Sequence, residues 1–110
     1  MKLLLKSQRA ALLKGSEKPI VKLFAPWGAA TWLLSELDPD GDRAFGLCDL
    51  GMGHPEMGYV SLAELERIRG PWGLQIERDM HFEARGTLAQ YADAAREAGG
   101  ITAIRGSPAC

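Results

Sequence analysis

Apolar and polar positions along the chain form short blocks that predict strands. Four segments have this pattern: residues 20–25, 31–37, 43–50 and 75–83. In the last segment Ile76, Met80 and Phe82 lie on one predicted face, and charged residues lie on the other. Residues 51–58 interrupt the pattern with three glycines and a proline, so we expect a loop there.

The connection between the second and third predicted strands has a strong turn signal. Pro39 presets φ, Asp40 bonds the backbone that follows it, and Gly41 accepts a positive φ without strain. We therefore expect residues 31–50 to form a hairpin.

Three helices are predicted from capping residues and from the spacing of apolar side chains. Their expected ranges are residues 7–14, 61–69 and 87–98. Ser7 is placed to cap the first helix. Ser61 and the glutamate three residues later have the spacing of a capping box, and Thr87 and the glutamine three residues later repeat it.

The order of these elements predicts an α+β fold. Because the early connections are hairpin-like, we expect one antiparallel sheet of about four strands with about three helices packed on one face. A chain of 110 residues forms a single domain. We assign this domain to residues 1–99 and expect residues 100–110 to be a flexible tail.

The charges nearly balance, but they are unevenly distributed along the chain. The 13 Lys and Arg residues against 14 Asp and Glu leave a net charge of −1, which excludes a uniformly basic nucleic-acid binder. Residues 1–22 carry +5 and residues 36–56 carry −5. This asymmetry predicts a positive and a negative end, which either steer a partner or only keep the protein in solution.

Several classes of chemistry lack their sequence signals. The chain has no phosphate-binding loop, no dinucleotide fingerprint and no nucleophile elbow, and its two cysteines and two histidines are too few for the common zinc motifs. We therefore expect no cofactor and no catalytic residue. No apolar run is long enough for a membrane span, and no secretory signal is visible, so we expect a cytoplasmic protein that does not contact a membrane.

Basic and aromatic side chains are the first candidates for binding. Trp72 lies in a loop rich in glycine and proline beside Arg69, as in proteins that stack nucleic-acid bases, although tryptophans also close cores under loops. Arg78 interrupts an apolar face and is expected either to pair with Glu56, Glu64 or Glu66, or to bind a ligand. The candidate binding residues are Lys2, Lys6, Arg9, Lys14, Arg69, Trp72 and Arg78.

The polar face of the fourth predicted strand offers an alternative site. Glu77, Asp79 and His81 are two residues apart, so on a continuous strand they would lie roughly 7 Å from one another. They would then be able to share a divalent ion, as in a small metal-dependent hydrolase. The same pattern is typical of a strand whose charged face meets water.

Two central stretches resemble a bacterial family of unknown function. They are residues 55–66 (PEMGYVSLAELE) and 69–79 (RGPWGLQIERD), followed by Phe82, and the start of the chain at residues 2–4 and Arg9 is also similar. The family is identified as domain-of-unknown-function family 2958. The resemblance implies a cytoplasmic accessory protein encoded on bacterial plasmids and mobile elements. It carries over no catalytic residue.

These observations favour a non-enzymatic accessory module of a bacterial mobile element that binds protein or nucleic acid. The alternative is a metal-dependent hydrolase that uses Glu77, Asp79 and His81. The sequence leaves the oligomeric state open.

Overall fold

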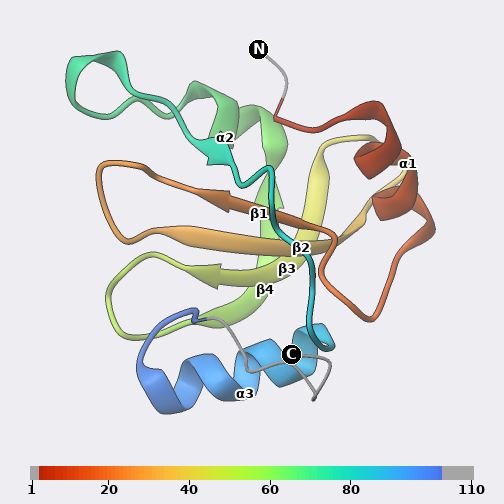
Figure 1. The fold of residues 1–110 in the computed structure, drawn as a ribbon. Helices are drawn as coiled ribbons and strands as arrows, with labels where there is room; N and C mark the ends of the chain where they lie inside the picture. Colours follow the sequence, from red (N-terminus) through yellow and green to blue (C-terminus); the bar gives the residue numbers. More distant parts are fainter. Residues whose placement is uncertain (1–2, 103–110) are drawn as a thin grey trace.

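A five-stranded antiparallel sheet forms the centre of the computed structural model, which describes residues 3–102 (Figure 1). The strands lie in the order β4-β3-β2-β1-β5. Their bounds are β1 Val21–Phe24, β2 Thr31–Leu37, β3 Arg43–Asp49, β4 Glu56–Ser61 and β5 Glu77–Arg78. The helices are α1 Lys6–Lys14, α2 Leu62–Arg67 and α3 Leu88–Ala98, with a short 3-10 turn, η1, at Pro71–Gly73. The predicted α+β single-domain class is therefore confirmed.

The predicted hairpin between β2 and β3 is present, with its turn where the sequence placed it. The Asp40 carboxylate accepts hydrogen bonds from the amides of Asp42 and Arg43, at 2.8 and 3.0 Å, and Gly41 has φ of 79°. Farther along the hairpin Gly46 lies directly against the Leu33 carbonyl, where a Cβ atom would have no room. This close contact makes glycine necessary at position 46.

The prediction of a loop over residues 51–58 is wrong for residues 56–58, because Glu56–Ser61 form β4. Six consecutive residue pairs join β4 to β3 without a register shift, from Arg43 opposite Ser61 to Cys48 opposite Glu56. The glycines and proline of this segment indicate a loop only when the segment is considered alone. Pairing with a neighbour that is distant in sequence overrides that local preference.

The long strand predicted at residues 75–83 is also wrong, since β5 contains only two residues. The Asp79 amide still donates to the Lys22 carbonyl, at 2.9 Å, but the Asp79 carboxylate then accepts from the His81 amide and turns the chain. Met80, predicted to face the core, is 78% exposed. The alternating pattern continued past the point where strand pairing stops.

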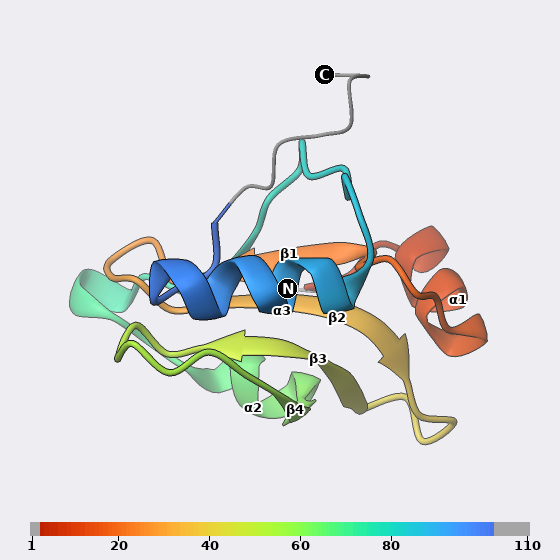
Figure 2. The same cartoon turned by 90° about the horizontal axis from the view of Figure 1, so that it is seen from below.

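Helices cover both faces of the sheet, not one face as predicted. Trp32 and Leu34 in β2 pack into a core with Leu12 of α1 and Leu65 of α2. Leu33, between them, faces the opposite side and packs into a second core formed by α3. Figure 2 shows the same arrangement, with α3 in front of the strands and α2 behind them. Alternate residues of a central strand therefore serve two different cores.

Two of the three predicted N-cap residues, Ser61 and Thr87, cap their helices, and the second helix ends at Arg67, two residues before the predicted end. The first helix begins at Lys6, with Leu5 as its N-cap residue in place of Ser7. The Ser61 hydroxyl accepts from the Glu64 amide at the start of α2, at 3.2 Å, which forms half of the predicted capping box. The second predicted box, at the start of α3, is complete, since Thr87 bonds in both directions with Gln90.

The third helix is held to the rest of the fold at both of its ends. In its first turn the Leu88 amide donates to the Glu17 carbonyl, at 2.7 Å. After its last turn the Ile101 amide donates to the buried carboxylate of Asp49, at 2.8 Å. Ile101, which the sequence placed in a flexible tail, thus packs against the domain, and residues 103–110 lie outside the described part of the chain.

Candidate functional site

The predicted basic residues do not form one surface, because three of the arginines bond the protein's own backbone. Arg9 donates to the Gly41 carbonyl at 2.8 Å. Arg69 donates to the carbonyls of Glu66 and Ile68, at 2.7 and 3.1 Å. These guanidinium groups join neighbouring elements of the fold and are less available to a ligand.

Arg78 has a different partner from those predicted. Its guanidinium donates to the Leu3 carbonyl at 2.6 Å, not to a glutamate carboxylate. The Glu66 carboxylate accepts from the Leu3 amide, at 3.4 Å. Arg78 and Glu66 therefore hold the two backbone groups of Leu3 and fix the N-terminal segment on the sheet.

The predicted separation into a positive and a negative end is wrong for the described residues. The α1 helix lies beside the acidic β2–β3 turn, as its Arg9–Gly41 bond shows, and Gly15 at its end approaches the Glu36 side chain. Opposite charges that are distant in sequence thus meet in space. Lys6 and Lys14 are exposed on α1, and Lys2 lies outside the described residues.

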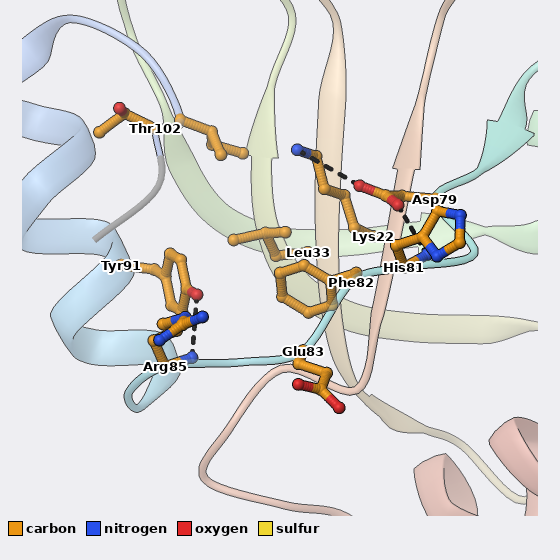
Figure 3. A pocket seen from close by; sticks show the side chains of 10 residues that line it. Lys22, Leu33, Asp79, His81, Phe82, Glu83, Arg85, Tyr91 and Thr102 are labelled. Atoms are coloured by element: carbon orange, nitrogen blue, oxygen red, sulfur yellow. Dashed lines mark hydrogen bonds and ion pairs between the residues drawn. The ribbon is translucent and has the colours of Figure 1, made fainter. Parts of the chain in front are cut away.

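The predicted row of Glu77, Asp79 and His81 is interrupted, because β5 ends at Arg78 and the chain turns at Asp79. Asp79 and His81 instead line a cavity of about 260 Å³ on the α3 side, which Glu77 does not line. In Figure 3 Asp79 meets the Lys22 ammonium, at 3.8 Å, while the Phe82 ring and Leu33 form an apolar floor. Within residues 3–102 no group of three or more side chains is suited to hold a metal ion.

The Trp72 loop, in contrast, is a defined and exposed hairpin. Arg69 and Gln75 form a β-bridge at its base, and the Gly70 amide donates to the Leu74 carbonyl at 2.7 Å. Trp72 lies at the tip, is 98% exposed, and has a φ of 56°. This left-handed conformation is rare for a bulky residue and indicates that the hairpin constrains the tip.

A second tryptophan fixes the base of this hairpin. The Trp27 ring, in the β1–β2 connection, lies directly against the backbone of Gly70, where a Cβ atom would overlap the ring. Trp27 is half-buried against the core. The hairpin is therefore packed on the domain, and its tip is held away from it.

Three connections meet at one end of the molecule, which we call the loop end: residues 25–30, 50–55 and 68–74. Figures 1 and 2 both show them side by side at the left. In addition to the Trp27–Gly70 contact, a Cβ atom on Gly51 would lie 2.9 Å from the Ala29 side chain. Of the ten large apolar residues that are exposed in the described chain, five lie on these connections: Leu50, Met52, Ile68, Trp72 and Leu74.

A groove of about 630 Å³ runs from the loop end along α2. Leu50 and Ile68 line its apolar part, whereas its charged part is lined by three carboxylates and one guanidinium group: Asp40, Asp42, Glu64 and Arg43. Hydrogen bonds from the amides of Asp42 and Arg43 lower the pKa of Asp40. The Ser61 hydroxyl and then the Ala63 amide lower the pKa of Asp42. Both carboxylates are therefore charged at neutral pH.

Comparison with known proteins agrees with the resemblance seen in the sequence. A protein-family model described as "Protein of unknown function (DUF2958)" matches residues 1–102. The chain belongs to this family. No curated protein matches this DUF2958 chain, and no solved structure matches it. Within residues 3–102, no helix has the length and apolar character needed to cross a bilayer.

The sequence identified Trp72 as a candidate but missed the apolar residues around it. Leu50 comes from the end of a predicted strand, Met52 from a segment interpreted only as a loop, and Ile68 from the end of a predicted helix. Their shared signal is that each is a large apolar side chain just beyond a strand or helix. That signal becomes specific only when the topology brings the three connections together.

Proposed function

We propose that this DUF2958 protein is a non-enzymatic module that binds a protein partner through its loop end, with Trp72 as the anchor residue. The observation that carries the proposal is the exposure of Trp72, at 98%, on a hairpin that is packed at its base. A tryptophan buries a large apolar area when a partner covers it. Tryptophan is also among the residues most enriched at the energetic centres of interfaces.

The conformation of the hairpin supports this role. Because the Arg69–Gln75 bridge and the Trp27 contact fix the backbone, little freedom is left to lose when a partner binds. Contiguous exposed apolar surface is uncommon on monomeric soluble proteins and marks interaction sites. The loop end combines both properties.

The charges near the hairpin favour a protein over a nucleic acid. The adjoining groove contains Asp40, Asp42 and Glu64, which would repel phosphates. Arg69, the arginine nearest the tip in sequence, bonds two backbone carbonyls. A basic and apolar surface on a partner protein complements the groove and the loop end together.

The setting of the module is part of the same proposal. We place it in the cytoplasm of a bacterium, as an accessory protein of a mobile element. The support is what the resemblance of residues 55–66 and 69–79 to this family implies.

Quantitative affinity capture from the cells that encode the protein tests the proposal. The comparison uses wild type, Trp72→Ala and the matched control Met80→Ala, which truncates another exposed apolar residue outside the three connections of the loop end. A partner recovered with wild type and Met80→Ala should be lost with Trp72→Ala. With that partner purified, calorimetry should show binding weakened by at least about tenfold, which is about 1.4 kcal/mol.

Two results would contradict the proposal. One is equal recovery of every partner by wild type and Trp72→Ala, with both proteins folded. The other is tight binding of a labelled single-stranded DNA that weakens steeply with added salt, which would favour a nucleic-acid partner. Because Trp72 has little contact with the domain, Trp72→Ala should keep the free energy of unfolding within about 0.5 kcal/mol of wild type.

A further inference from the structure

The two edges of the sheet differ in how they are protected. At one edge β5 has only two residues, and the chain turns away at Asp79. At the other edge β4 is six residues long and largely exposed. A long exposed edge strand has unpaired amides and carbonyls that are ready to pair with another strand.

The β4 edge lacks the features that usually block such pairing. It contains no lysine and no internal proline, and its register with β3 has no shift, unlike that between β2 and β3 at Leu34/Glu36. Its apolar side chains also reach the surface, since Met57 is 38% and Tyr59 54% exposed. Bulges, lysines and prolines are the common means of blunting an edge.

We infer that β4 pairs antiparallel with β4 of a second copy of this chain and forms a symmetric dimer with a continuous ten-stranded sheet. In a symmetric antiparallel pair one residue lies opposite its own copy. When Gly58 has that position, Met57 of each copy lies opposite Tyr59 of the other. These two residues flank Gly58, so a two-fold rotation brings the thioether of one onto the aromatic ring of the other.

The surroundings of the strand fit this register. No atom comes within 4 Å of the position a Cβ would have on Gly58, so a side chain introduced there meets open space. Tyr59 is held by the Phe45 ring, at 5.0 Å between centroids, and by the Arg43 guanidinium, at 4.2 Å. These two contacts with β3 fix the position of the ring, and the residue stays 54% exposed.

Charge does not oppose the pairing. Glu56 is the charged residue of β4, and in the Gly58-centred register it lies opposite Val60 of the other copy. The two Glu56 residues are then about four residues apart along the strands, roughly 13 Å, which exceeds the screening length at physiological salt. An unrelated extended peptide has no such built-in match, which is why we assign the edge to a second copy.

Sedimentation velocity on the full chain between about 1 µM and about 1 mM tests the dimer. The apparent mass of the wild-type protein should rise with concentration from 11.9 kDa toward twice that value. Met57→Glu/Tyr59→Glu places like charges opposite each other and should weaken dimerisation at least tenfold. Met57→Lys/Tyr59→Glu places opposite charges in the same positions and should restore it. Met80→Glu, the matched control, should behave as wild type.

A cross-link tests the register independently of these side chains. In a Cys110→Ser background, Gly58→Cys should form a disulfide-linked dimer under mild oxidation, because the two copies of residue 58 are adjacent. Ser61→Cys should not, because the two copies of residue 61 lie at opposite ends of the pair. A wild type that stays at 11.9 kDa at every concentration overturns the inference. So does a dimer that the double glutamate variant forms equally well, or one that Ser61→Cys links and Gly58→Cys does not.

Discussion

The loop end and the opposite end of the molecule use their side chains in different ways. At the opposite end, which we call the turn end, the β2–β3 turn lies beside α1 and the start of α2, and its polar groups bond one another. The Asp42 carboxylate accepts from the Ser61 hydroxyl at 2.6 Å and from the Ala63 amide at 2.8 Å, and Arg9 reaches Gly41. At the loop end apolar side chains extend into water.

This difference separates the part of the protein that stabilises the fold from the part that is free to bind. Polar groups that are already hydrogen-bonded gain little from a partner, since binding must first break those bonds. Apolar side chains in water gain from any surface that covers them. The charges of the turn end therefore stabilise the fold first and act on a partner only through their field along the groove, whereas the apolar side chains of the loop end gain directly when a partner covers them.

The largest change in the free energy of unfolding is expected when the close contact at the loop end is removed. Gly70→Ala forces the Trp27 ring off the hairpin base and should lower the free energy of unfolding by about 2 kcal/mol. Urea denaturation measures it. The same substitution made in a Trp27→Ala background should cost much less, because the overlapping ring is gone. Equal costs in both backgrounds would show that Trp27 does not hold the hairpin.

A smaller effect is expected at the turn end. Ser61→Ala removes the hydroxyl that caps α2 and that donates to Asp42, and it should cost about 1 kcal/mol. The measurement is again urea denaturation, with Ser7→Ala as the matched control, because Ser7 lies inside α1 and caps no helix there. If Ser7→Ala costs as much as Ser61→Ala, the cap at α2 contributes nothing specific.

The smallest expected effect is a dependence on acid at the turn end. The pKa values of Asp40 and Asp42 lie below their ordinary value of 3.8 in the folded protein. Their charged forms therefore stabilise the fold above that value, and the contribution is lost as the pH falls through the folded pKa. Thermal melts between about pH 5 and about pH 2 should show a shallower acid decline for Asp42→Asn than for wild type. Parallel curves would contradict this account.

The sequence predicted the elements whose causes are local. The β2–β3 turn depends on Asp40 and Gly41, and α3 begins at Thr87 and ends at Gly99, whose αL conformation closes the helix. Each of these residues acts within a few positions of itself. A single sequence is sufficient to recognise them.

Elements that depend on distant partners were missed. The β4 strand exists because β3 pairs with it along six residues, and β5 is short because the chain turns at Asp79 after two residues have paired with β1. In the site, Trp72 was recognisable from its Gly-Pro-Trp-Gly context, but the apolar residues around it come together only through the topology. The arginines were misjudged because their backbone acceptors are up to 75 residues away.

The two anchors of α3 have a consequence for how the chain is closed. One anchor joins the helix start to Glu17, and the other joins residue 101 to Asp49 across 52 residues of sequence. When one anchor opens, the other still holds the helix on the sheet. Water reaches Leu33 and Leu47 beneath the helix only when both anchors open together. This face of the sheet therefore stays closed to partners, whereas the loop end stays accessible.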